Sequence, residues 1–173
     1  KRVQILFAGK AHPMDEKGKA IIKALVLKQK EFPESVVFLE DYDMDLGAML
    51  TRGCDVWLNN PQRPREACGT SGMKAAMNGV VYVRVLEGRW PEIWKHGVNG
   101  WAIGDEVVPR DETEQDKRDA EYLYQVLTEE VIPTFENDKE QWGRMMIKSI
   151  QDTRVAYSAC RMVKDYCEKL YHI

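Results

Sequence analysis

The 173-residue chain lacks any apolar run near the roughly 18 to 20 residues that a membrane span needs. Its start, KRVQILFAGKAHP, has too short an apolar segment and no small-residue tail of the kind that a signal peptide carries. It also lacks a basic stripe, because its 25 Lys+Arg and 28 Asp+Glu residues are interspersed. The sequence therefore indicates neither a membrane nor a nucleic acid as a partner, and we expect a cytoplasmic protein.

Cysteine is scarce, and its spacing is not that of a metal site. Cys54, Cys68, Cys160 and Cys167 lie far apart, with no CxxC pair and no histidine at ligand spacing. The pattern predicts reduced structural thiols and no zinc site. Internal repeats and low-complexity tracts are also missing.

What the chain does contain is typical of a soluble globular domain. Its residues are 44% hydrophobic and 31% charged, and a length of 173 residues fits one domain. An expected strand begins almost at once, with no preceding methionine, which suggests a fragment cut from something longer.

Short apolar runs alternate with helical patterns along the first part of the chain. The runs are rich in β-branched residues and apolar on both faces, as in parallel strands covered by helices on both sides. We expect strands at 3–8, 35–40, 54–59, 80–86 and 100–104, and helices at 15–31, 43–52 and 71–77. This order predicts an α/β fold with a doubly wound, mostly parallel, Rossmann-like sheet and right-handed crossovers.

After Gly104 the composition becomes polar and acidic, which favours a surface loop. A helix is expected to begin near Thr113 and to end by Pro133, followed by helices at 138–152 and 159–171. We therefore expect a single domain, with an α/β core at 1–104 and a helical C-terminal extension at 105–173. Methionines and aromatic residues at helical spacing in this extension predict core packing.

The loop after the third strand carries the most informative motif, because ligands of open parallel sheets bind at the carboxyl ends of strands. In CGTSGMK a glycine-rich loop passes into a helix and leaves the backbone N–H groups of residues 69–72 unpaired. A helix N-terminus attracts phosphate, and Thr70 or Ser71 can cap the helix. The pattern alone leaves two interpretations equally open: a phosphate site, or an ordinary capped helix after a glycine turn.

Charged residues flank this loop. Lys74 is expected on the first turn of the helix, where the dipole disfavours its ammonium form and favours the neutral amine that a Schiff base requires. Glu66 would lie across the same crevice, where a carboxylate can accept hydrogen bonds from sugar hydroxyls. Taken singly, a surface lysine and a solvated loop acid explain them equally well.

Weaker candidates lie in the other loops. His12 is expected to be a hydrogen-bonded structural histidine rather than a catalytic one. Lys10 and Lys19 either meet a phosphate or are solvated, and Asn59 and Asn60 either border a sugar pocket or form a turn.

The segment EACGTSGMKAAMNG resembles the pyridoxal-phosphate segment of the α-glucan (glycogen, starch and maltodextrin) phosphorylases, whose pattern runs Glu-Ala-Ser-Gly-Thr, two residues, Met-Lys, then Asn-Gly. LFAGKAHP, VVFLEDYDM, DVWLNNPQRP and GVNGWAIG are similar to the accompanying blocks, in the same order, from residue 3 to about 104. RMVKDYCEKLY is similar to the final helix. The resemblance implies the second lobe of a two-lobed B-type glycosyltransferase, with the N-terminal lobe absent from this chain.

The resemblance also implies roles for individual residues. Lys74 matches the lysine that tethers pyridoxal phosphate as a Schiff base, while Thr70, Ser71 and Gly72 match the loop that holds the cofactor's phosphate. Tyr42 matches a tyrosine beside the cofactor. Contacts with glucosyl hydroxyls are implied for the segment before the helix, namely Glu66, Ala67, Cys68 and Gly69.

The implied activity is the reversible transfer of glucosyl units between an α-1,4-glucan and inorganic phosphate, which gives glucose 1-phosphate with retention of configuration. In the family the cofactor phosphate exchanges a proton with the substrate phosphate, and the lysine is a tether rather than a base. The chain departs from the family pattern at Cys68, which stands where the family has serine. The family's upstream basic segment and acceptor-binding lobe have no counterpart here, so the isolated chain is expected to be inactive.

Two other functions stay open at this stage. One is the lobe of a glycosyltransferase that uses a sugar nucleotide without pyridoxal phosphate, although such relatives generally place a second glutamate where Lys74 stands. The other is a non-catalytic glucan-binding module, for which the scattered tryptophans offer no platform. A homo-oligomer is also left open.

Overall fold

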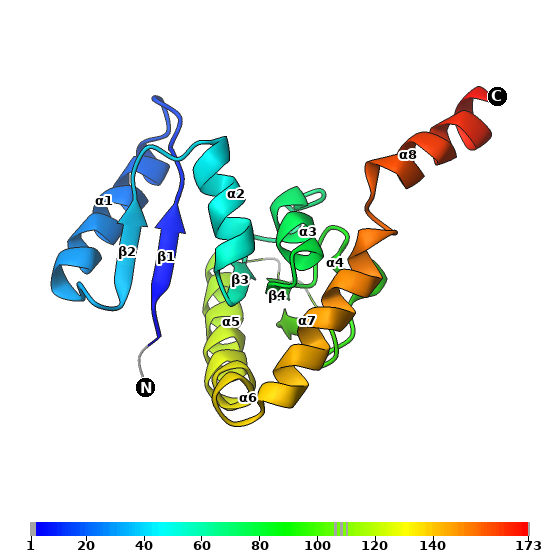
Figure 1. The fold of residues 1–173 in the computed structure, drawn as a ribbon. Coiled ribbons are helices and arrows are strands. Elements are labelled where there is room, and N and C mark those ends of the chain that lie inside the picture. Colours follow the sequence, from blue (N-terminus) through cyan, green and yellow to red (C-terminus); the bar gives the residue numbers. More distant parts are fainter. Residues whose placement is uncertain (1–2, 106, 108, 110, 173) are drawn as a thin grey trace. The chain divides into compact units, whose positions relative to one another are not determined.

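The computed structural model describes residues 3–105, 107, 109 and 111–172 of the chain (Figure 1). The chain divides into two compact units, Lys1–Met49 (unit 1) and Leu50–Ile173 (unit 2). Each unit contains its own parallel sheet.

Unit 1 is built from one strand–helix–strand motif. Strand β1 (Ile5–Ala8) pairs in parallel with β2 (Val36–Leu39), with Ile5 opposite Val36. Helix α1 (Glu16–Glu31) connects them and packs on β2, where the Gln29 side chain accepts a hydrogen bond from the Phe38 amide at 2.6 Å. None of the residues described in this unit is buried.

Unit 2 holds a three-stranded parallel sheet in the order β3 (Val56–Asn59), β4 (Val81–Val85) and β5 (Gly100–Ile103). Helix α2 (Met44–Gly53) leads into it, α3 (Thr70–Met77) connects β3 to β4, and the short α4 (Trp90–Ile93) connects β4 to β5. All five residues of β4 are buried because this strand is central. Its apolar sequence follows from that position.

The rest of unit 2 is helical. Helix α5 (Glu112–Gln125) continues through a π-helical segment, η1 (Val126–Val131), into α6 (Ile132–Asn137). Helix α7 (Lys139–Arg154) then packs against α3 and β4, and α8 (Ala159–Tyr166) and a second π-helical segment, η2 (Cys167–Tyr171), follow. No helix in the described part of the chain is long and apolar enough to cross a membrane.

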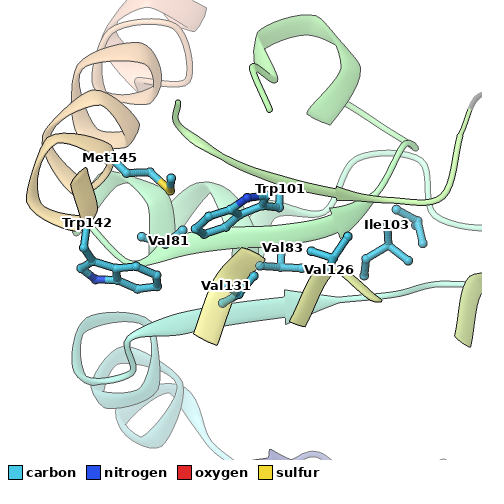
Figure 2. Packing of buried hydrophobic residues seen from close by; sticks show 9 residues of the cluster. Val81, Val83, Trp101, Ile103, Val126, Val131, Trp142 and Met145 are labelled. Carbon is cyan, nitrogen blue, oxygen red and sulfur yellow. The ribbon is translucent and has the colours of Figure 1, made fainter. Parts of the chain in front are cut away.

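The core of unit 2 lies between one face of the sheet and the C-terminal helices (Figure 2). The side chains of Trp101 on β5 and Trp142 on α7 meet with ring centroids 5.9 Å apart. The fully packed cluster comprises Val81, Val83, Val85, Trp101, Ile103, Val126, Val131, Trp142 and Met145. The prediction that aromatic and methionine side chains of the C-terminal helices form core is confirmed for Trp142 and Met145 and is wrong for Met146, Met162 and Tyr166, which are exposed.

All five predicted strands are present, and the α/β class with parallel sheets is confirmed. The predicted end of a helix at Pro133 is wrong, because the helical backbone continues to Asn137. Pro133 lies in the first turn of α6, directly after the π-helical segment. A proline is tolerated there because its missing N–H would not have been bonded within the new helix.

Candidate functional site

The candidate site lies in unit 2, where residues 60–69 connect β3 to α3. Arg63 anchors the start of this loop, with only 4% of its surface exposed. Its guanidinium donates to the Asp105 carbonyl at 2.5 Å and to the Asp119 carboxylate at 2.9 Å. The Gln115 amide, oriented to satisfy both groups, pairs with the Arg63 backbone N–H and C=O. The loop is therefore fastened to α5 and to the segment after β5.

Helix α3 begins without a side-chain cap. Gly69 is its N-cap residue with φ of 80°, in the left-handed region, and the first turn holds no acidic residue. The prediction that Thr70 or Ser71 caps the helix is wrong, because both already lie inside its first turn. In contrast, Asp15, Asp111 and Asp138 cap α1, α5 and α7 with their carboxylates. No capping side chain therefore accepts a hydrogen bond from the first backbone N–H groups of α3.

The exposed face of α3 carries the residues singled out from the sequence. Gly72, Ala75 and Ala76 form its buried face. Thr70 and Lys74, four residues apart, lie on the opposite, exposed face. Lys74 lies beyond the first turn predicted for it. Its ammonium group makes no hydrogen bond or ion pair within the part of the chain that the structure describes.

Glu66 is held on one side only. Its Oε2 accepts a hydrogen bond from Asn59 Nδ2 at 2.8 Å and lies 2.9 Å from Nη2 of Arg84. Its Oε1 has no hydrogen bond within the described residues, and 31% of the side chain is exposed. Asn59 at the end of β3 therefore supports the Glu66 carboxylate, and a role of Asn59 in bordering a sugar pocket stays a prediction.

Arg84 lies beneath the loop and was not singled out from the sequence. It is the last but one residue of β4, between Val83 and Val85, with 1% of its surface exposed. Its Nη1 donates to the Tyr82 hydroxyl at 2.8 Å and, at 3.4 Å, to the Cys68 carbonyl. A lone arginine within the apolar run VVYVRVL is the signal that could have revealed it, since a buried charge requires a partner.

Glu87 supports the same loop from below. Its Oε1 accepts a hydrogen bond from the Glu66 amide at 2.9 Å, while its Oε2 is buried with no hydrogen-bond partner among the described residues. Burial raises the pKa of the Glu87 carboxyl, and the hydrogen bond from Glu66 and the charge of Arg84 only partly offset this effect. Burial also raises the pKa of the Tyr82 hydroxyl.

The space beneath α3 is almost filled. The cavity that Gly69, Tyr82, Arg84 and Trp90 help to line is only about 10 Å³, which is room for about one water molecule. A β-carbon at Gly72 would overlap the Tyr82 ring. This cavity is therefore too small for a sugar or a phosphate.

Tyr42 lies in unit 1, whereas the segment from Glu66 to Lys74 lies in unit 2. It follows β2, has 37% of its surface exposed, and its hydroxyl lies near Gly47. Unit 1 also has an open cleft of about 430 Å³ at the carboxyl ends of its strands, lined in part by Lys10 and Lys19. His12 has the expected structural contact, since its Nδ1 accepts a hydrogen bond from the Met14 amide.

A family model described as carbohydrate phosphorylase matches residues 1–99, a span that includes the loop, α3 and β4. The chain belongs to the carbohydrate phosphorylase family. It is 47% identical over 172 residues to the maltodextrin phosphorylase of Thermococcus litoralis, covering 98% of this chain and 20% of that protein. It is also 47% identical over 176 residues to the glycogen phosphorylase of Aquifex aeolicus, covering 98% of this chain and 25% of that protein. The chain thus spans a fifth to a quarter of the length of these relatives.

The fold of this phosphorylase-family chain also resembles that of a solved structure. The crystal structure of Anabaena Alr3699/HepE in complex with UDP-glucose matches 99% of this chain and 41% of that protein, with a TM-score of 0.69. At 18% identity the likeness concerns the fold alone. The chain has a mixed α/β fold with parallel sheets, similar to that of B-type glycosyltransferases.

Proposed function

We propose that this chain is the cofactor- and glucosyl-binding lobe of an α-glucan phosphorylase. The longer protein would transfer glucosyl units reversibly between an α-1,4-glucan and inorganic phosphate, giving glucose 1-phosphate with retention of configuration. The observation that carries the proposal is the segment from Glu66 to Lys74. Among the described residues, Oε1 of Glu66 has no hydrogen bond, the N-terminus of α3 has no side-chain cap, and the Lys74 ammonium has no partner.

The donor set of α3 suits pyridoxal phosphate. The exposed amine of Lys74 can be the Schiff-base tether, and the uncapped amides and hydroxyls of Thr70 and Ser71, with the amide of Gly72, can hold a phosphate. Thr70 and Lys74 share a face, so the phosphate and the tether would lie on the same side of the helix. When bound, the cofactor supplies a phosphate group that exchanges a proton with the substrate phosphate.

The segment Glu66, Ala67, Cys68 and Gly69 is proposed to bind the glucosyl ring. The free Oε1 of Glu66 can accept a hydrogen bond from a sugar hydroxyl, because its other oxygen is already engaged by Asn59 and Arg84. The thiol of Cys68 is a weaker hydrogen-bond partner than a serine hydroxyl, so backbone contacts would dominate at that position.

The first prediction concerns the cofactor in the full-length protein. After borohydride reduction, mass spectrometry is expected to find a pyridoxyl adduct on the peptide that contains Lys74, with the matching absorbance. Lys74→Arg should abolish both the adduct and glucose 1-phosphate formation from glucan and phosphate. Lys117→Arg, which changes an exposed lysine on α5, should alter neither.

An unmodified Lys74 peptide in the reduced full-length protein would overturn the phosphorylase proposal. The 173-residue chain alone is expected to show no phosphorolysis, because the acceptor-binding lobe and the upstream basic segment are not part of it. Phosphorolysis by the isolated chain would contradict that expectation.

A further inference from the structure

We propose that Arg84 is a positioning residue that selects one glucosyl hydroxyl by fixing the carboxylate of Glu66. The inference rests on the proposed role of Glu66 in sugar binding. Arg84 itself is buried beneath the loop and would not touch the sugar.

The guanidinium is confined on several sides. Its Nη1 donates to the Tyr82 hydroxyl and to the Cys68 carbonyl. A β-carbon at Gly69 would overlap this same nitrogen, and one at Gly88 would lie 2.9 Å from Nη2. The 2.9 Å contact between Nη2 and Glu66 Oε2 is an ion pair outside hydrogen-bond geometry, and the close packing around the guanidinium limits how far the two groups can move apart.

The two oxygens of the Glu66 carboxylate have different roles in this arrangement: Oε2 contacts the protein and Oε1 is available to the sugar. Oε2 accepts a hydrogen bond from Asn59 at the end of β3 and forms an ion pair with Arg84 on β4, so two neighbouring strands fix its position. The Glu66 amide is tied to Glu87, which follows β4. Oε1 has no hydrogen bond within the described residues and is left available to a ligand. A carboxylate that cannot rotate can favour one hydroxyl position over its neighbours.

A purely structural role for Arg84 makes a different prediction. A buried arginine that only stabilises the sheet would, when removed, loosen the whole loop and weaken all sugar contacts alike. A positioning residue affects chiefly the hydroxyl that Glu66 contacts. Analogues that each lack one hydroxyl therefore separate the two roles.

The experiment uses the full-length protein and isothermal titration calorimetry with glucose 1-phosphate and its monodeoxy derivatives, without glucan. Glu66→Gln identifies the hydroxyl that Glu66 contacts. The derivative that lacks this hydroxyl binds the wild type more weakly than glucose 1-phosphate does, but this difference disappears in Glu66→Gln. Arg84→Met is expected to reduce the discrimination against that same derivative about 10-fold or more, and to leave the other derivatives near wild-type ratios. Arg84→Lys, which keeps the charge but not the planar fork, should retain part of the discrimination.

Two controls make the result specific. Arg63→Met removes another buried arginine of the same loop, whose partner is Asp119, and is expected to leave the discrimination unchanged even if the melting temperature falls. In a double-mutant cycle, Arg84→Met should add little to the loss already caused by Glu66→Gln. Equal losses for every derivative, or wild-type discrimination in both Arg84 variants, would overturn the inference.

The proposed function and this inference fail in different ways. If the wild-type protein shows phosphorolysis but Arg84→Met leaves the discrimination intact, only the inference is wrong. If phosphorolysis is missing but the variant loses discrimination, the phosphorylase proposal is wrong and the inference stands. If the wild-type protein binds no glucose 1-phosphate, both are wrong.

Discussion

Glu87 is a carboxyl group that the fold keeps largely from water. One of its oxygens accepts a hydrogen bond from the Glu66 amide and the other is buried with no hydrogen-bond partner among the described residues. Because burial raises its pKa, the folded state holds a proton on Glu87 more tightly than the unfolded state does. The stabilisation from this group is therefore complete below its unfolded pKa and is lost as the pH rises through the folded pKa.

Glu87→Gln provides a test of that sign in the 173-residue chain. The glutamine amide mimics the protonated acid. The free energy of unfolding of the Glu87→Gln variant should therefore rise relative to that of the wild type as the pH increases from about 4.5. Chemical denaturation at a series of pH values measures the difference. Glu121→Gln, at an exposed position of α5, should give a flat difference across the same range. A flat line for Glu87→Gln as well would contradict the assignment.

Residue types and their spacing were enough to single out Glu66 and Lys74, because a local motif carries them. Arg84 was not predicted, because its proposed role depends on Glu66. That residue is 18 positions away in sequence, and only the pairing of β3 with β4 brings it close. Asn59 shows the same limit, since only the fold brings its side-chain amide within hydrogen-bond distance of Glu66. The cofactor and sugar roles of residues 66–74 and Tyr42 stay predictions.

At the scale of elements, the start of α3 depends on a glycine. Gly69 has a φ of 80°, and a side chain there would overlap the buried guanidinium of Arg84. Gly143 differs, because it lies inside α7, where a β-carbon would have nothing within 4 Å of it. Replacement by alanine should therefore destabilise the fold at Gly69 and stabilise it at Gly143.

Gly69→Ala is expected to lower the free energy of unfolding of the 173-residue chain by about 2 kcal/mol or more, from backbone strain and displacement of Arg84. Gly143→Ala should raise it by about 0.5–1 kcal/mol, because alanine is the better helix former. Denaturant titration followed by circular dichroism measures both. A neutral Gly69→Ala would show that α3 can begin without the left-handed residue.

The strands were predictable because their apolar runs are short, rich in β-branched residues and separated by helical patterns. Helix ends were less so. The stop expected at Pro133 was overridden by the π-helical segment before it, which the local sequence does not reveal. The cap expected at Thr70 was displaced by a glycine that packs against Arg84.

At the scale of the whole chain, burial is distributed unevenly. The packed cluster of the described chain belongs to unit 2, whereas no described residue of unit 1 is buried. Strand β4 is paired on both sides and buried along its length. Local opening should therefore cost much more in unit 2 than in unit 1. Whether the two form the single lobe expected from the sequence stays a prediction.

Hydrogen exchange followed by mass spectrometry tests this difference in the 173-residue chain. Peptides that cover β4 should be the slowest to exchange, and those that cover β1 and β2 should exchange orders of magnitude faster. Peptides from the exposed start of α5 give the fast reference. Equal protection of β2 and β4 would contradict the expectation.

The position of the tryptophans has a practical consequence. All five, Trp57, Trp90, Trp94, Trp101 and Trp142, belong to unit 2, and unit 1 contains none. Intrinsic tryptophan fluorescence therefore reports on unit 2, and a change confined to unit 1 should not alter it. A reduced pyridoxyl group on Lys74 absorbs light where indole emits, so the natural sequence already carries the donors for energy transfer to the proposed cofactor position.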